Sequence, residues 1–405
     1  MVNSANFTVK NRHPNCSILA KIMTDSMAPI PFVDLSFQYQ ELTDEIEKAI
    51  HAVIGRGDFI LGRALQEFEA DFATACGAEY GVGVACGTDA IAIGLQACGV
   101  KPGDEVLVPA NTFIATIIGI LQARAKPVLV DCELNTALID IAAAERAVTE
   151  KTKAILPVHL YGQIVTPSQL LDLALTHNLI VFEDAAQAHL ATCENYRAGS
   201  IGRAAAFSFY PSKNLGAFGS GGMVVTSDET VAKQARILRN YGAPEKYLHT
   251  ELGTNSRLDT IQSAVLNVKL RHLPGWNRDR NLAAEQYDVQ LMVLKEYGII
   301  PIYNYSEGGH VYHLYVIRVT EECSLTRDQL QAKLNELGVQ TGIHYPIPCH
   351  LQPGYTDLGY KAGDFPKTET LSQQILSLPM YPGITSDQIN RVVAAIRTAL
   401  GIKNE

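Results

Sequence analysis

The segment Ile180-Val-Phe-Glu-Asp-Ala-Ala-Gln-Ala-His189 joins a short apolar run to two adjacent acidic residues. Apolar runs of this length are typical of strands in a parallel sheet that is covered on both faces. Similar runs occur at 80–86, 105–108, 126–130, 153–157, 178–182 and 204–209. Helix-like segments lie between most of them, so the pattern predicts an α/β fold with a mostly parallel sheet flanked by helices. In such a sheet, carboxylates at the carboxyl ends of the strands face the ligand crevice.

The alternation of strand-like and helix-like segments ends at about residue 275. Residues 311–318 alternate as a strand, and residues 325–337 and 386–400 have helical spacing. We therefore expect three parts: a polar N-terminal extension at 1–28, a large α/β domain at 29–275 and a smaller C-terminal α+β domain at 276–405.

The composition excludes several classes of protein. The 405 residues include 33 Lys and Arg against 42 Asp and Glu, which gives a formal net charge of −9. We expect no nucleic-acid polymer as a partner, because such binders need a basic surface. A hydrophobic fraction of 47% with 19% charged residues is typical of a folded globular chain and not of a disordered one.

Cysteine usage and apolar stretches bear on location. The eight cysteines form no C-x-x-C pair, so we expect reduced thiols, no metal site and a cytoplasmic protein. The uncharged stretch 106–123 reaches the length of a membrane span, but Pro109 and several polar residues favour a strand, a turn and a helix. The first 30 residues lack the apolar core of a signal peptide, and we expect no membrane partner.

A lysine and an aspartate follow two of the predicted strands. In Phe207-Ser-Phe-Tyr-Pro-Ser-Lys213, an apolar run leads through a proline turn to the lysine, and glycine-rich sequence follows. Asp184 lies at the carboxyl end of another strand, 29 positions earlier. Taken singly, Lys213 reads as an exposed turn lysine and Asp184 as a helix N-cap.

A third segment, Cys86-Gly-Thr-Asp-Ala90, lies at a strand end that enters a helix. The backbone N–H groups at Gly87 and Thr88, with the Thr88 hydroxyl, could bind a phosphate, although Thr88 alone also reads as an N-cap. A phosphate cup, then Asp184, then Lys213 is the order that holds pyridoxal 5'-phosphate. The aspartate would keep the pyridine nitrogen protonated, and the lysine would form the Schiff base.

From about Ile30 to about Leu400 the sequence resembles the sugar aminotransferases of the DegT/DnrJ/EryC1/StrS group, which have the aspartate-aminotransferase-like (type I) fold. The matching segments are Pro31-Phe-Val-Asp-Leu35, Gly87-Thr-Asp-Ala90, Val108-Pro-Ala-Asn-Thr-Phe-Ile-Ala-Thr116, His159-Leu-Tyr-Gly162, Glu183-Asp-Ala-Ala-Gln-Ala-His189, Ser208 to Lys213 and Gly253-Thr-Asn-Ser-Arg-Leu258. Ser220, Leu190 and Cys86 depart from the family's usual pattern.

The resemblance implies a role in cofactor binding for several residues. They are Lys213 as the Schiff-base lysine, Asp184 at the pyridinium nitrogen, Gln187 at the phenolic oxygen, Phe113 stacked on the ring, and Gly87, Thr88 and Ser208 at the phosphate. It also implies that Asn255 reaches the phosphate site of a neighbouring subunit, and hence a homodimer with shared active sites. Without the resemblance, Asn255 reads as a loop or cap asparagine.

The resemblance further implies a transaminase that moves an amino group from an amino acid, by family likeness L-glutamate, to a nucleotide-linked keto sugar. Residues 255–264 and 269–272 are most similar to members that act on 3-keto-6-deoxyhexoses, and members that act on 4-keto sugars are the nearest rivals. His344, Tyr345 and His350 are candidates for the sugar-nucleotide side. A structural loop held by its two prolines explains the same segment equally well.

The sequence disfavours two alternative functions. The sugar dehydratases of the same fold carry histidine at the lysine position, so Lys213 argues against them. A non-catalytic regulatory protein of the same fold is disfavoured by the complete set of Lys213, Asp184, Gln187 and Phe113.

Overall fold

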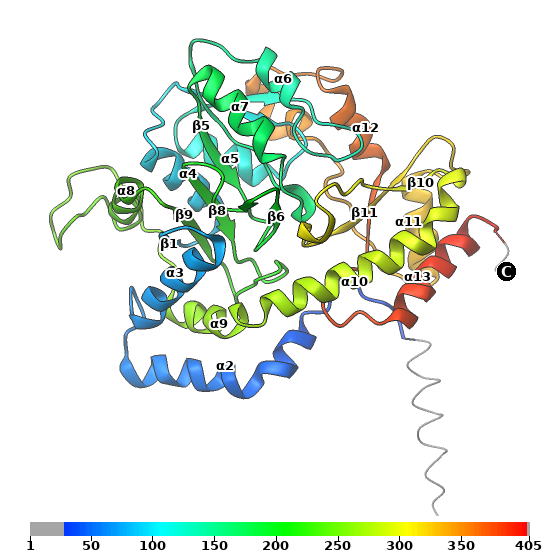
Figure 1. Cartoon of the computed structure of the whole chain (residues 1–405), viewed down its shortest axis with the longest axis horizontal. Helices are drawn as coiled ribbons and strands as arrows, with labels where there is room; N and C mark the ends of the chain where they lie inside the picture. The colour runs from blue at the N-terminus through cyan, green and yellow to red at the C-terminus, as the bar shows by residue number, and fades with distance from the viewer. Residues whose placement is uncertain (1–27, 403–405) are drawn as a thin grey trace, which may run out of the picture.

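The computed structural model describes residues 28–402 (Figure 1). The predicted N-terminal extension at 1–28 lies outside the described residues except for Ala28. A seven-stranded sheet, a three-stranded sheet, a two-stranded hairpin and the helices around them make up the described chain.

The larger sheet has seven strands in the order β1-β9-β8-β5-β4-β2-β3. From β8 to β3 all neighbours are parallel, and β9 runs antiparallel to both β1 and β8. The mostly parallel α/β sheet is therefore confirmed, while β9 was not predicted. The strands are β1 (Tyr80–Val84), β2 (Glu105–Pro109), β3 (Lys126–Val130), β4 (Thr152–Ile155), β5 (Ile180–Asp184), β8 (Ala204–Ser208) and β9 (Gly222–Thr226).

Helices cover both faces of this sheet (Figure 1). They are α2 (Ser36–Arg56), α3 (Arg63–Cys76), α4 (Gly87–Ala97), α5 (Ile114–Gln122), α6 (Ile141–Arg146), α7 (Pro167–His177), α8 (Glu229–Arg239) and α9 (Thr260–Leu270). Helix α4 approaches β5 closely, since a Cβ on Gly94 would lie 2.5 Å from the ring of Phe182. Side chains alternate along a strand, so Asp184 shares the face of Phe182, and Glu183 points to the other face.

The second sheet has three antiparallel strands in the order β10-β11-β12, and a two-stranded hairpin, β6 (Thr192–Cys193) and β7 (Tyr196–Arg197), lies apart from it. The strands are β10 (Ile299–Pro301), β11 (Tyr315–Val319) and β12 (Ile375–Leu378), and the helices beside them are α10 (Leu273–Leu291), α11 (Arg327–Glu336), α12 (Pro366–Gln374) and α13 (Ser386–Ala399). Both α11 and α13 begin with a capping box, in which Thr326 and Thr385 hold the first turn.

Helix α10 runs from beneath the seven-stranded sheet to the three-stranded one (Figure 1). The predicted boundary at 275/276 falls inside this continuous helix. Ile30 packs in the same core as Tyr287, and its backbone N–H donates to Gly338 O at 2.8 Å. The start of the described chain therefore packs with its C-terminal part, and the domain limits 29–275 and 276–405 stay a prediction.

The stretch 106–123 contributes most of β2 and the whole of α5, as predicted. Within residues 28–402, none of the helices combines the length and the apolar character that crossing a membrane requires.

Candidate active site

A cavity of about 470 Å³ opens where the carboxyl ends of β5 and β8 meet the N-terminus of α4. It brings together nine of the residues singled out from the sequence. They are Gly87, Thr88, Phe113, Asp184, Gln187, Ser208, Lys213, His344 and Tyr345. These residues come from segments more than 250 positions apart, so the fold and not the local sequence assembles the site.

One end of the cavity is suited to an anion. A Cβ on Gly87 would lie 2.7 Å from the Ser208 Cβ, so only glycine allows this close approach of α4 to β8. Cys86, and not Thr88, is the N-cap, and its Sγ accepts from Asp89 N at 3.5 Å. The Thr88 and Ser208 side chains line the cavity beside the first turn of α4. The N–H groups of a first turn have no partners within their helix, and the helix dipole favours negative charge there.

Asp184 is buried in the cavity wall, with 5% of its surface exposed. Its Oδ2 accepts from Thr116 Oγ1 at 2.8 Å, and its Oδ1 accepts from Ala186 N at 3.1 Å. A turn and not a helix follows, so the N-cap alternative is wrong. Burial raises the pKa of Asp184, and this outweighs the lowering effect of those hydrogen bonds and of the Lys213 charge. A further N–H donor or a cation in the cavity would therefore stabilise the charged form of this carboxylate.

Lys213 projects into the same cavity from the turn that follows β8. Burial lowers its pKa to about 8, although the charge of Asp184 opposes the shift. An amine with this pKa is partly unprotonated near neutral pH and can act as a nucleophile or a base.

An aromatic wall closes one side of the cavity. Phe113 is 49% exposed, and its ring centroid lies 5.1 Å from that of Tyr345. Gln187 bridges the wall, since its Oε1 accepts from Tyr161 N at 2.7 Å and its Nε2 donates to the Tyr345 hydroxyl at 3.2 Å. A flat ring can pack against the open face of Phe113.

Two histidines, His313 and His344, also line the cavity, and the His344 ring lies 5.5 Å from that of Tyr345. Burial and the charge of Lys213 lower the pKa of His344 to about 4 and that of His313 well below its ordinary value. His313 Nδ1 lies 3.2 Å from Asn214 Oδ1. The Asn214 amide nitrogen donates to Asn277 and to Val311 O, so its oxygen is the acceptor and His313 Nδ1 carries the proton. His313 therefore presents its Nε2 lone pair as an acceptor.

His313 and Thr116 are site residues that the sequence analysis missed. His313 lies in the segment 311–318 that we interpreted as a strand, whereas β11 begins only at Tyr315. Thr116 is in the first turn of α5, and its hydroxyl lies 2.7 Å from that of Thr112, which precedes the helix. Thr116 could have been found from the sequence, because it ends the segment 108–116 that resembles the family.

Comparisons with known proteins identify the family of the chain. Residues 40–397 match the model of the DegT/DnrJ/EryC1/StrS aminotransferase family. The chain belongs to this family. Among curated proteins, it is 43% identical to the dTDP-3-amino-3,4,6-trideoxy-alpha-D-glucose transaminase of Streptomyces venezuelae, over 91% of this chain and 95% of that one.

Two solved structures of aminotransferases are similar. DesV of S. venezuelae, solved in complex with a ketimine intermediate, has a TM-score of 0.88 and 41% identity, and the match covers 93% of this chain and all of that one. NtdA from Bacillus subtilis, solved with bound PMP cofactor, has a TM-score of 0.86 and 32% identity, and the match covers 92% and 86% of the two chains. The type I aminotransferase fold and the family that the sequence indicated are confirmed.

Enzymes of this family depend on pyridoxal 5'-phosphate, and the cavity fits that cofactor. It combines a helix terminus suited to an anion, an aromatic wall, a buried carboxylate that forms no ion pair within residues 28–402 and a lysine amine of lowered pKa. Among residues 28–402 there is no group of three or more His, Cys, Asp or Glu side chains that could hold a metal ion.

Two predicted site residues of the aminotransferase lie outside the cavity. Asn255 is exposed, next to an arm of residues 241–252 that projects from the end of α8 (Figure 1). His350 is only 2% exposed, and its Nε2 lies 3.0 Å from Glu369 Oε1. A buried ring that is already paired does not suit the predicted contact with substrate, so the position of His350 corrects that expectation.

Proposed function

We propose that this aminotransferase moves an amino group from an amino acid, for which we expect L-glutamate, to a nucleotide-linked 3-keto-6-deoxyhexose. The observation that carries the proposal is the single cavity in which Lys213, of lowered pKa, and buried Asp184 lie near the N-terminus of α4. The S. venezuelae relative is named for a 3-amino sugar linked to dTDP, which supports both the 3-keto position and the nucleotide.

We assign the cofactor contacts as the sequence suggested. Gly87, Thr88 and Ser208 would hold the phosphate, Phe113 would cover the ring, and Asp184 would keep the ring nitrogen protonated. Gln187 has an amide N–H group with which to meet the phenolic oxygen. The chemistry that pyridoxal 5'-phosphate supplies when bound is an electron-poor ring that stabilises a carbanion next to the amino nitrogen.

Lys213 is the group that we assign to proton transfer. Its amine projects into the cavity and has a pKa of about 8, which is close to the working range of a general base and acid near neutral pH. It would take the proton from the α-carbon of the donor and return a proton during amination of the sugar. The charge of Asp184 holds the Lys213 pKa higher than burial alone would, so Lys213 can both accept and deliver the proton.

The sugar side would be formed by His313, His344 and Tyr345. Both histidines are neutral at physiological pH, because burial lowers their pKa values. His313 offers an acceptor at Nε2, which suits a sugar hydroxyl. Neutral groups at this end leave Lys213 and Asp184 as the charged side chains that line the cavity.

We also propose a homodimer in which Asn255 serves the partner's phosphate site. The arm of residues 241–252 supports a second copy, because Tyr247 is 84% exposed and Leu252 is 91% exposed. Large apolar side chains so fully exposed are typical of a surface that another chain covers. The cytoplasmic location stays a prediction.

An acceptor panel tests the proposed function. Purified enzyme with pyridoxal 5'-phosphate and L-glutamate is offered 3-keto and 4-keto 6-deoxyhexoses linked to dTDP or UDP, and the amino sugar is measured by mass spectrometry. We expect amination of the 3-keto dTDP sugar, and loss of activity in Lys213→Ala. Turnover of 4-keto sugars alone would instead favour the rival reaction.

A further inference from the structure

The loop of residues 342–350 carries Tyr345 into the cavity and is held at its first end by β12. Gly342 exchanges two backbone hydrogen bonds with Ser377, at 3.0 and 2.7 Å. His344 Nδ1 lies 2.9 Å from Ser377 Oγ, and the His344 carbonyl accepts from the Tyr161 hydroxyl at 2.7 Å. The half of the loop before Tyr345 is therefore fixed by backbone and side-chain contacts.

The second end of the loop is held differently. Cys349 Sγ donates to Thr112 O at 3.2 Å. Next to it, His350 Nε2 donates to Glu369 Oε1 at 3.0 Å, and the His350 ring lies edge-on to Phe365 at 4.9 Å. A carboxylate only accepts hydrogen bonds, so the proton of this partly buried contact belongs to the histidine. Hydrogen bonds to an ionised partner are about twice as strong as neutral ones.

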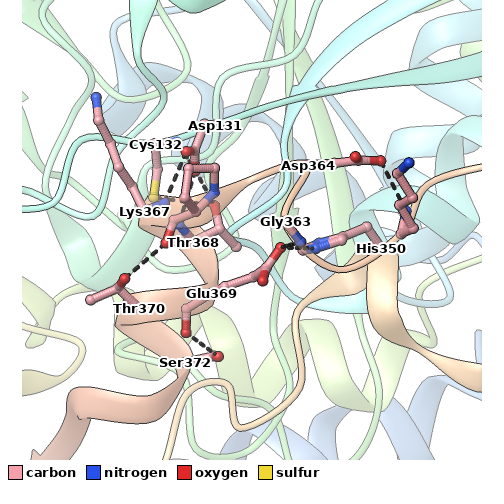
Figure 2. A network of polar contacts seen from close by, with 12 residues as sticks. Asp131, Cys132, His350, Gly363, Asp364, Lys367, Thr368, Glu369, Thr370 and Ser372 are labelled. Carbon is pink, nitrogen blue, oxygen red and sulfur yellow. Dashed lines mark hydrogen bonds and ion pairs between the residues drawn. The ribbon is translucent and has the colours of Figure 1, made fainter.

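Glu369 can act as an anchor because its own helix, α12, is fixed to the large sheet. Asp131, which directly follows β3, accepts from Lys367 N at 3.0 Å, from Thr368 N at 2.9 Å and from the Thr368 hydroxyl at 2.7 Å. Figure 2 shows Asp131 facing the first turn of α12 while Glu369 turns toward His350. An aspartate 237 positions away thus satisfies the first N–H groups of α12, as an N-cap would.

Between these two anchors, Tyr345 meets the cofactor side of the cavity. Its hydroxyl accepts from Gln187 Nε2 at 3.2 Å, and its ring packs on Phe113. Both contacts come from residues that we assign to the cofactor. A shift of the loop end at His350 would therefore change the two groups that meet the cofactor ring and its oxygen.

We propose that the His350–Glu369 pair is a positioning device, which holds the 342–350 loop so that the Tyr345 hydroxyl reaches Gln187. His350 acts through the loop and does not touch substrate. The inference rests on the proposed function for its catalytic consequence, but not for its structural one. Active sites need their side chains within about 0.5 Å of the productive geometry, and misplacement by about 1 Å can cost 100-fold in rate.

The test compares His350→Leu, which removes the donor, with His350→Gln, which keeps an N–H group at the same reach. In the holoenzyme, we expect His350→Leu to lower kcat about tenfold with pyridoxal 5'-phosphate still bound, and His350→Gln to recover most of the loss. Glu369→Gln is a second variant from the other side of the pair. Lys367→Met is the matched control, since it removes only the ion pair with Asp140 from the same network and should stay within about twofold of wild type.

Two readouts separate positioning from general destabilisation. Hydrogen exchange should speed up at residues 342–350 in His350→Leu and not in Lys367→Met. In a Tyr345→Phe background, His350→Leu should cost less than about twofold, because the contact it positions is already gone. Equal losses in the Tyr345 and Phe backgrounds, or unchanged exchange in the loop, would overturn the proposal. If wild type aminates no keto sugar, the proposed function fails, and the exchange measurement still decides the role of His350.

Discussion

At the scale of single residues, burial shifts the pKa values of Lys213 and Asp184, and the charge of each residue opposes the shift of the other. The Lys213 pKa of about 8 means that, in the cofactor-free protein, the amine loses its proton about 2.5 pH units below the ordinary lysine value of 10.5. We predict that the rate at which this protein captures pyridoxal 5'-phosphate rises with pH through about 8 and then levels off. Stopped-flow absorbance measures it. In Asp184→Asn the midpoint should move to lower pH, because the carboxylate raises the lysine pKa; a midpoint near 10.5 in wild type would contradict this account.

The hydrogen bond from Thr116 lowers the pKa of Asp184. The Thr116 hydroxyl donates at 2.8 Å and opposes burial, which raises this pKa. Thr116→Val should therefore favour the protonated carboxyl, weaken its hold on a protonated ring nitrogen and reduce kcat about tenfold, which corresponds to about 1.4 kcal/mol. Thr116→Ser keeps the hydroxyl and serves as control in the same steady-state assay. Equal losses in both variants would mean that the methyl group, and not the hydrogen bond, matters.

At the scale of elements, the phosphate end depends on how closely α4 approaches β8. Gly87→Ala should lower the affinity for pyridoxal 5'-phosphate at least tenfold, because the new Cβ would lie 2.7 Å from the Ser208 Cβ and push the first turn of α4 away. Gly55→Ala is the matched control. This helical glycine in α2 has open space around it, so the change should leave the affinity unaltered and stabilise the fold by about 1 kcal/mol. Fluorescence titration and thermal unfolding measure the two effects.

The elements also show what the sequence could and could not predict. Apolar runs bounded by polar residues marked the strands that carry Asp184 and Ser208, because a doubly covered strand leaves that pattern. The strand β9 was missed, since the glycines before Met223 read as a loop and an antiparallel strand within a parallel sheet has no distinct periodicity. His350 was misinterpreted for a different reason. Its partner Glu369 lies on a helix whose position depends on Asp131, and no local pattern reports such a contact.

At the scale of the whole molecule, the described chain supplies a cavity with two charged side chains in its lining, and an arm whose apolar side chains project into solvent. A lone subunit leaves both Asn255 and Leu252 exposed. We predict that light scattering after size-exclusion chromatography gives the mass of a dimer, and that Leu252→Asp shifts it toward the monomer, because a charge in an apolar interface is costly to bury. A wild-type monomer would remove the basis for a shared site.

Complementation between two inactive variants tests whether the sites are shared. If Asn255 serves the partner's phosphate site, Asn255→Ala should lower cofactor affinity, and Lys213→Ala should abolish activity. In a mixed dimer of the two, one site would combine both defects, and the other would combine an intact Lys213 with an intact Asn255 from the partner. Refolding the variants together should therefore restore activity at low cofactor concentration that neither homodimer shows. If Asn255 serves its own subunit, each site of the mixed dimer keeps one defect and mixing restores nothing, so the assay separates the two arrangements without a structure of the dimer.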